Sequence, residues 1–326
     1  MKRPSAVLMS LLLLFSTPFL FGALHAADEY PDREIRIIMG FPPGSAAELS
    51  LRALVQVASK HIKKPLVVLN KPGASQTIAM AELAAATPDG YTIGMTTDGY
   101  KSMTVRTQKM RFDPKALRFV LGYARFRHVL FVRSDLPYAK YDDFITYAKK
   151  APAAVAYGGT GEGSTPDLIG RVFFRDVNVK PTYIPYKGSN EYIAAVLGGH
   201  LQSGVIDISG VRKQLQAGQL KLVVVFGDNR LEEFPDVPSS KEKGHSDLNL
   251  FNSVLSIVVH KDVPADRVAY LHDALKRAVD DSEFAKLCDD MGLKAQYTSP
   301  QAAEAGVLKM EQLGVPLLKE LKLFVE

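Results

Sequence analysis

The sequence predicts an α/β protein of two units, in which short buried strands alternate with helices, followed by a C-terminal helical tail. Runs of β-branched and apolar residues alternate with segments whose apolar residues recur at helical spacing. The chain has 326 residues, which exceeds one ordinary core and suits two lobes of about 150 residues each. After residue 260 the pattern is almost wholly helical.

The first unit is predicted to begin with three strands separated by two helices. In chain order these elements are strand 35–39, helix 46–62, strand 65–69, helix 78–86 and strand 91–96. Pro and Gly at 70–73 and 87–90 interrupt the pattern as loop residues do. Strand–helix–strand at this spacing implies a parallel sheet covered by helices.

A second run of the same kind starts near His128. Its predicted strands are 129–132, 155–157, 182–185, 205–208 and 222–226, and its predicted helices are 141–150, 166–176, 190–197 and 211–217. A further strand at 255–259 precedes helices at 264–281, 282–291 and 299–323. This tail has no predicted strand of its own, so we expect it to pack on one lobe and make that lobe discontinuous.

Composition excludes several classes of protein. A net charge of +5 with no Lys/Arg block argues against a nucleic-acid surface. The lone Cys288 excludes an internal disulfide and a cysteine-based zinc cluster, and we expect it to be a small buried residue. The histidines lack metal-ligand spacing, and no nucleophile elbow is present. We therefore expect no catalytic residues, no metal and no cofactor.

The first 26 residues have the layout of a secretory signal peptide. Lys2 and Arg3 precede an apolar run at 6–24, and small residues follow at Ala26 and Ala27, where we expect cleavage. A membrane anchor is the alternative, but Pro18 interrupts the apolar run. Loss of Lys2 and Arg3 lowers the net charge from +5 to +3. We expect the mature chain to be soluble and exported.

Two of the predicted helix starts follow flexible loops after a strand. At 41–48, exposed amides at the helix start would favour an anion, but Ser45 and Glu48 have the spacing of a capping box that would satisfy those amides internally. At 157–166, four glycines let the backbone approach a ligand closely, and Thr165 can cap the helix. This loop matches neither a dinucleotide fingerprint nor a P-loop, and an ordinary turn is the alternative.

A third helix start lies at 185–190, where Lys187 offers a positive charge and Ser189 a cap. Each of these features is also common on a solvated surface. Asp207 ends an apolar strand and would accept a hydrogen bond from a ligand or cap a turn. Thr97 and Asp98 follow another strand, at the carboxyl edge where ligands bind in α/β sheets.

Seven short motifs occur in a characteristic order. They are Tyr-Pro-Asp-Arg-Glu-Ile-Arg-Ile-Ile at 30–38, Phe-Pro-Pro-Gly at 41–44, Val-Val-Leu-Asn-Lys-Pro-Gly-Ala at 67–74, Ala-Thr-Pro-Asp-Gly-Tyr-Thr at 86–92, Pro-Tyr-Lys-Gly-Ser at 185–189, Leu-Gly-Gly at 197–199 and Phe-Pro-Asp-Val-Pro at 234–238. With the export signal, this order resembles the Bug family, the extracytoplasmic solute receptors of tripartite tricarboxylate transporters. The resemblance covers about residues 30–323.

The resemblance implies a periplasmic binding protein of type II-like fold, with two α/β lobes around a ligand cleft and a tail returning to the first lobe. It implies a first lobe of 27–127 plus 255–326 and a second of 128–254, with crossings near 123–129 and 251–256. A small mono- or dicarboxylate would bind between the lobes of a monomer. The expected binding residues are Gly44, Ser45, Ala46, Ala47, Thr97, Asp98, Thr160, Gly163, Ser164, Thr165, Tyr186, Lys187, Gly188 and Asp207.

The implied function is capture of the carboxylate in the periplasm and delivery to a membrane permease. A sensor that signals to a membrane kinase, a periplasmic α/β enzyme and a purely structural exported protein are the alternatives. Four residues depart from the family pattern and bear on the ligand class. Ser45 and Ala46 stand where Gly is frequent, Glu48 replaces Asp, and Glu162 adds negative charge to a loop expected to face an anion.

Overall fold

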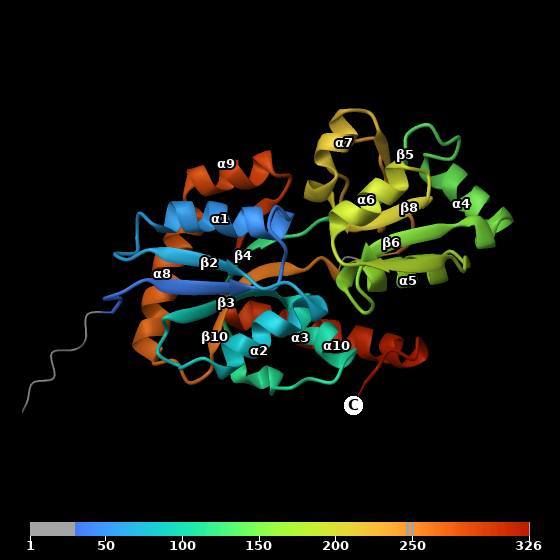
Figure 1. The fold of residues 1–326 in the computed structure, drawn as a ribbon. Coiled ribbons are helices and arrows are strands. Elements are labelled where there is room, and N and C mark those ends of the chain that lie inside the picture. The colour runs from blue at the N-terminus through green and yellow to red at the C-terminus, as the bar shows by residue number, and fades with distance from the viewer. Residues whose placement is uncertain (1–29, 246–247, 249–250, 326) are drawn as a thin grey trace, which may run out of the picture. The chain divides into compact units, whose positions relative to one another are not determined.

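Two mixed β-sheets, each covered by helices, make up the fold (Figure 1). The computed structural model describes residues 30–245, 248 and 251–325, and the predicted signal peptide lies outside them. The first sheet has six strands in the order β11-β4-β10-β3-β1-β2, and the second has five in the order β7-β6-β8-β5-β9. The two-lobed α/β class predicted from the sequence is confirmed.

The first lobe is formed by the six-stranded sheet and its helices. Its strands are β1 (Ile35–Met39), β2 (Leu66–Asn70), β3 (Thr92–Thr97), β4 (Leu117–Arg125), β10 (Val254–His260) and β11 (Lys294–Thr298). Its helices are α1 (Ala46–Ala58), α2 (Thr77–Ala85), α3 (Asp98–Ser102), α8 (Ala265–Asp280), α9 (Ser282–Asp290) and α10 (Pro300–Glu320). Helix α1 packs against α8 and α9, while α10 packs against α3, so each group of helices covers one side of the sheet (Figure 1).

The second lobe is formed by the five-stranded sheet and its helices. Its strands are β5 (His128–Arg133), β6 (Ala156–Thr160), β7 (Thr182–Tyr186), β8 (Ser203–Asp207) and β9 (Leu220–Val225). Its helices are α4 (Tyr141–Lys150), α5 (Thr165–Asp176), α6 (Ser189–Leu197) and α7 (Arg212–Gln216). Short 3₁₀ turns connect several elements. In the part of the chain that the structure describes, no helix has the length and apolarity needed to span a bilayer.

The predicted parallel arrangement is confirmed for the first three strands, whereas the expectation of a tail without strands was wrong, and two strands were missed. Strand β1 pairs in parallel with β2 and β3, but β10 runs antiparallel to β3 and to β4. Strand β4 was missed because Gly122 interrupts it and no turn residues separate it from β5. Strand β11 was missed because its sequence, Lys-Ala-Gln-Tyr-Thr, is mostly polar; it pairs with β4 at the edge of the sheet.

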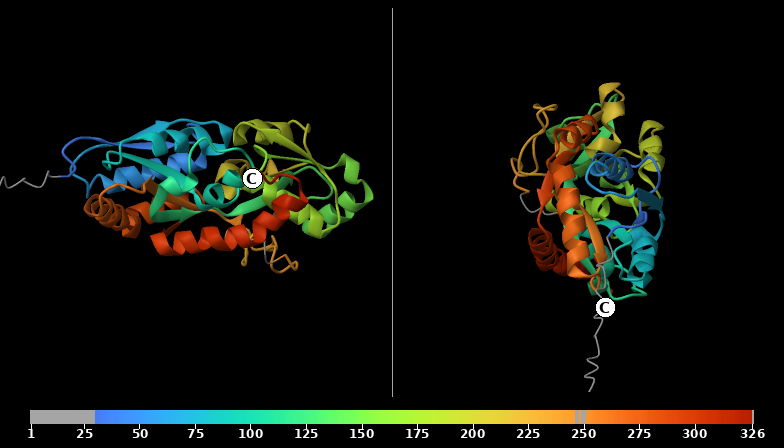
Figure 2. Two further views of the ribbon diagram at one scale, coloured as in Figure 1. Left: turned by 90° about the horizontal axis from the view of Figure 1, so that it is seen from below. Right: turned by 90° about the vertical axis from the view of Figure 1, so that its left-hand side faces the viewer.

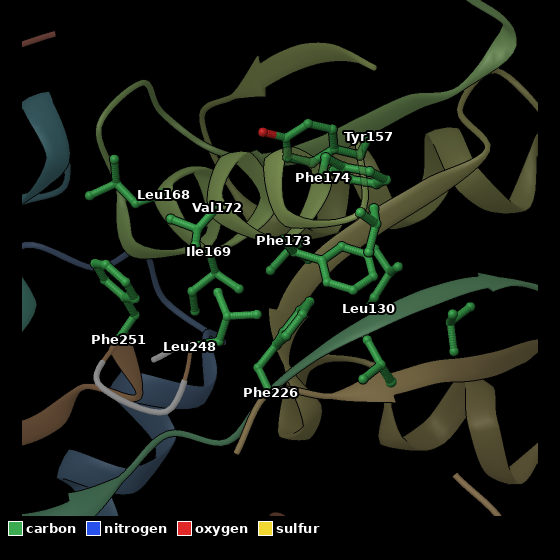
Figure 3. Close-up of a cluster of buried hydrophobic side chains, with 14 of the residues drawn as sticks. Leu130, Tyr157, Leu168, Ile169, Val172, Phe173, Phe174, Phe226, Leu248 and Phe251 are labelled. Carbon is green, nitrogen blue, oxygen red and sulfur yellow. The ribbon is translucent and has the colours of Figure 1, made fainter. Parts of the chain in front are cut away.

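A large apolar cluster fills the space between α5 and the second sheet. Figure 3 shows the α5 side chains facing Phe226, Leu248 and Phe251. The rings of Phe173 and Phe226 meet edge to face with centroids 5.4 Å apart, a favourable geometry for aromatic pairs. Burial of the apolar α5 side chains fixes the position of α5, and therefore also the position of the loop that precedes this helix.

The C-terminal helix α10 contributes to the clusters of both lobes. Ala303 and Val307, near its start, pack with first-lobe residues such as Phe119. Leu317 and Leu318, near its end, belong to the α5 cluster. Figure 2 shows α10 running along elements of both lobes. The predicted return of the tail to the first lobe is confirmed, and the tail also contacts the second lobe. Cys288 in α9 is buried as predicted.

Replacement of Gly170 by Ala is expected to destabilise the fold. A Cβ there would lie 2.2 Å from the ring of the buried Tyr157. Because the ring of Tyr157 is buried and cannot move freely, we expect an overpacking cost near the upper end of the usual range, about 3 kcal/mol. The better helix propensity of Ala returns about 1 kcal/mol, which leaves a net loss of about 2 kcal/mol in denaturant unfolding. Gly306→Ala in α10 is the matched control, since its nearest neighbour would be 3.8 Å away. Equal stability of G170A and wild type would contradict the packing described.

Candidate functional site

A cavity of about 730 Å³ is lined by loops of both lobes and by the two segments that connect them. Most predicted binding residues line it. These are Ser45, Ala46, Ala47, Thr97, Thr160, Ser164, Thr165, Tyr186, Lys187, Gly188 and Asp207. The sequence therefore located the cavity, while the binding role of each residue stays a prediction.

Three predicted residues, Gly44, Asp98 and Gly163, do not line the cavity. Gly44 has φ +77° and donates its N–H to the carboxylate of Glu48 at 3.2 Å. Gly163 has φ +70° and donates its N–H to Asp167 at 2.8 Å, and a Cβ at Gly163 would lie 2.6 Å from Thr107 of the first lobe. A glycine at this position therefore lets the two lobes approach closely.

Helix α1 begins at the cavity with a partly satisfied set of amides. Ser45 is the N-cap and accepts the N–H of Glu48 at 3.3 Å, as the capping-box alternative predicts. The Glu48 carboxylate accepts from Gly44 instead of from Ser45. The N–H groups of Ala46 and Ala47 have no acceptor among the described residues, and both residues line the cavity. The capping box and an anion site therefore coexist, because they use different amides.

Helices α5 and α6 also begin at the cavity, and neither has a side-chain cap. The hydroxyl of the N-cap Ser164 donates to the Gly161 carbonyl at 2.9 Å and caps no amide of α5. Of the α5 residues that line the cavity, Thr165 has an N–H to offer and Pro166 has none. The N-cap of α6 is Gly188, which has no side chain to offer. Free amides and the positive end of the helix dipole attract negative charge. Three helix starts thus converge on one cavity.

Charged side chains contribute little to this attraction. Lys187 is the one lysine or arginine among the described residues that line the cavity, and it is exposed. Its backbone N–H donates to Glu191, another lining residue, at 3.3 Å. Glu162, the unexpected acid of the second loop, pairs with Arg171 at 3.3 Å and is largely exposed. Glu162 is not among the residues that line the cavity.

The two segments that connect the lobes form the floor of the cavity. Phe126 and His128 come from one segment and Ser253 from the other, and all three line the cavity. The Phe126 N–H donates to the Ser253 carbonyl at 2.9 Å, which ties the segments together. These residues were not predicted as binding residues, although the predicted crossings at 123–129 and 251–256 contain them.

One buried aspartate from each lobe holds a connecting segment. Asp98 accepts the N–H of Val254 at 2.9 Å, and Asp207 accepts the N–H of Arg127 at 2.6 Å. Burial raises the pKa of Asp98 to about 6 and raises the pKa of Asp207 to about 6 as well. Asp98 therefore anchors the segment below the cavity, and Asp207 combines an anchoring bond with a place in the wall.

The loop after β2 was recognised in the sequence only as a loop, yet it closes one side of the cavity. Ser75 and Gln76 line it and have φ values of +48° and +80°. The Gln76 side chain accepts a hydrogen bond from Thr96 at 3.0 Å. Non-glycine residues with positive φ carry no sequence signal, so this part of the wall was not predictable.

The fold and the cavity define a two-lobed periplasmic solute-binding protein. Residues 51–320 match the model of the tripartite tricarboxylate transporter family receptor, and the chain belongs to this family. It is 31% identical over 276 residues to the "UPF0065 protein in gbd 5'region" of Cupriavidus necator, covering 84% of this chain and 83% of that protein. The Bug resemblance seen in the sequence is confirmed.

Three solved structures have the same fold as this chain. The periplasmic binding protein BugD superposes with a TM-score of 0.82 at 22% identity, covering 91% of this chain and 100% of that chain. The adipate complex of Rpa4515 from R. palustris gives 0.83 at 23%, with coverage of 89% and 98%. MatC from Rhodopseudomonas palustris with bound malate gives 0.76 at 22%, with coverage of 87% and 99%.

Asp98→Asn is expected to change how stability depends on pH. Burial raises the pKa of Asp98 in the folded protein to about 6, above its ordinary value of 3.8, so the folded state takes up a proton first as the pH falls. Wild type should therefore gain about 2 kcal/mol of unfolding free energy relative to D98N between pH 7 and pH 4.5. Urea unfolding of both proteins at the two pH values measures this. A difference that does not change with pH would contradict the burial of an ionisable carboxyl at this position.

Proposed function

We propose that this protein is an exported receptor that captures a small mono- or dicarboxylate between its lobes and delivers it to a tripartite tricarboxylate-type permease. The observation that carries the proposal is the set of amides at the starts of α1, α5 and α6 that face one cavity without internal acceptors. The adipate and malate complexes of two structural relatives support the ligand class. Binding without chemical conversion is part of the proposal.

The amides are sufficient for a useful affinity. A hydrogen bond to a charged group contributes about 1.5–3 kcal/mol. Three or four such bonds, less the cost of ordering ligand and loops, correspond to micromolar binding at about −8 kcal/mol. Because the helix starts belong to both lobes, a ligand that contacts them favours the closed form. A permease that recognises the closed form would then accept only loaded receptor.

The moving bodies in this proposal are the lobes 27–127 with 255–326 and 128–254, and the receptor acts as a monomer. Close approach of the lobes at Gly163 and Thr107 supports a closed arrangement. The hinge would be the pair of connecting segments, which share the bond from Phe126 to Ser253. Helix α10 packs with both lobes, so closure must preserve its contacts at each end.

The function is tested by mass spectrometry of the ligand carried by protein purified without denaturation, followed by calorimetry with that compound. We expect a small carboxylate that binds at one site per chain and is recovered unchanged. Conversion of the ligand by the purified protein would favour the enzyme alternative. Absence of binding to any carboxylate would contradict the receptor proposal.

Ala46→Pro tests the role of the amides directly. Proline removes one free N–H, and the first helical position tolerates its ring, with Ser45 already extended at φ −73° and ψ 154°. We expect at least a tenfold loss of carboxylate affinity in calorimetry with little change in thermal stability. Ala46→Gly keeps the N–H and is the matched control, which should bind within about threefold of wild type. Equal affinity of A46P and A46G would exclude this amide from the site.

We also propose that export removes the segment that ends at Ala26 or Ala27. The periplasmic location of the family supports this. The intact mass of the protein recovered from the periplasm is expected to match a chain that starts at Ala27 or Asp28. A mass that retains Lys2 and Arg3 would support the membrane-anchor alternative.

A further inference from the structure

Two hydrogen-bond acceptors stand side by side on the floor of the cavity. His128 of β5 and Asp207 of β8 are direct partners across an antiparallel strand pair, so their side chains project from the same face of the sheet. Both residues line the cavity, and they are only 3% and 6% exposed. A ligand in the cavity therefore meets them together.

Asn252 lies beneath His128 in a fixed orientation. Its amide oxygen is 3.0 Å from the backbone N–H of His128, which can only donate. Its amide nitrogen contacts the backbone carbonyl of Phe226, which can only accept. Both contacts require the same assignment of oxygen and nitrogen, so a flipped amide is excluded.

This orientation fixes the tautomer of His128. The Asn252 oxygen also lies 3.2 Å from Nδ1 of the His128 ring, and since that oxygen can only accept, Nδ1 must carry the proton. Burial lowers the pKa of His128 to about 4, so the ring is neutral near pH 7. A neutral ring protonated at Nδ1 has a bare Nε2, which has no partner among the described residues. Because the Nδ1 edge faces Asn252 and the ring lines the cavity, Nε2 is the atom left for a ligand.

Asp207 is the second acceptor. One carboxylate oxygen accepts from the Arg127 N–H and the other from the Ser209 N–H and hydroxyl. These bonds consume part of its capacity, since two carboxylate oxygens offer about four acceptor sites. The Arg127 guanidinium lies close enough to lower the pKa of Asp207, which opposes the larger effect of burial. A charged carboxylate thus remains available beside a neutral acceptor.

We propose that the His128–Asp207 pair selects ligands that carry an O–H or N–H donor in addition to the carboxylate bound at the helix starts. This inference rests on the proposed receptor function. A second carboxylate placed against the pair offers no proton, so it would leave Nε2 desolvated without a partner and would place a second negative charge beside the Asp207 carboxylate. A hydroxyl can donate its one proton to either acceptor, whereas an amide NH2 group or an amine has enough N–H groups for both. A site built to bond a donor rejects the analogue that lacks it far more strongly than an apolar pocket rejects a missing methylene.

Calorimetry with matched compounds tests the selection. Malate differs from succinate by one hydroxyl. The monoamide of adipate has an amide in place of one carboxylate of adipate, and 6-aminohexanoate has an amine at that end. We expect at least one donor-bearing compound to bind tenfold or more tighter than its partner lacking the donor. Which compound gains identifies the donor as hydroxyl, amide or amine. Ratios near one for every comparison would overturn the inference while leaving the receptor function intact.

Two variants separate the acceptor from the shape of the cavity floor. His128→Leu removes Nε2 but keeps the backbone N–H that bonds Asn252, and it should reduce the donor preference to less than about threefold. Phe126→Leu changes the shape of the floor but keeps Nε2, so any loss of affinity should be equal for compounds with and without the donor, and the preference should be retained. A preference that survives in H128L would overturn the inference.

Nitrogen-15 NMR of labelled histidine in the wild-type protein supplies a readout independent of any variant. We expect His128 to be protonated at Nδ1 and bare at Nε2 without ligand, with a shift of the Nε2 signal when the donor-bearing compound binds. Protonation at Nε2 in the free protein would overturn the inference. If none of the compounds binds, both the receptor proposal and the inference fail for these ligands; binding with a bare Nε2 but no donor preference defeats the inference alone.

Discussion

The pair of connecting segments is the constraint on which the site depends. The bond from Phe126 to Ser253 fixes their separation, and Asp98 and Asp207 fix each segment to a different lobe. Because the segments are short and their amides are already used, side chains in them have few alternative orientations. The inferred His128 tautomer depends on this arrangement, because the backbone N–H of His128 and the carbonyl of Phe226 orient the Asn252 amide.

Helix α10 adds a second connection between the lobes. Its start packs on the first-lobe cluster and its end on the α5 cluster, and Arg175 of α5 pairs with Glu320 at 3.3 Å. The α5 cluster positions the loop at 160–165, so the tail affects the binding site without lining it. The proposed hinge motion must therefore keep both ends of α10 in contact with their lobes, including the ion pair of Glu320.

Much of the fold and of the cavity was predictable because the signals are local. Apolar runs located most strands, and glycine-rich loops before helices located two walls of the site. Strands β4 and β11 were missed because one is interrupted by glycine and the other is a polar edge strand. His128 and Ser253 were missed as cavity residues because their role depends on pairing between segments far apart in sequence, which leaves no local pattern. Gly163 was placed in the correct loop, but its closest neighbour, Thr107, lies in the other lobe.

The departures from the family pattern now have a structural meaning. The Ser45 hydroxyl accepts a hydrogen bond from the N–H of Glu48 and so caps the helix. This oxygen is therefore not an unpaired polar group in the cavity. Ala46 and Ala47 present only methyl groups beside their free amides, and a larger side chain at either position would cover them. Donors of the first lobe are thus backbone groups that cannot change with the side chain, whereas the acceptors on the floor, His128 and Asp207, are side chains that can. Selectivity among carboxylates is therefore expected to vary through the floor, while attraction of a carboxylate is maintained by the helix starts.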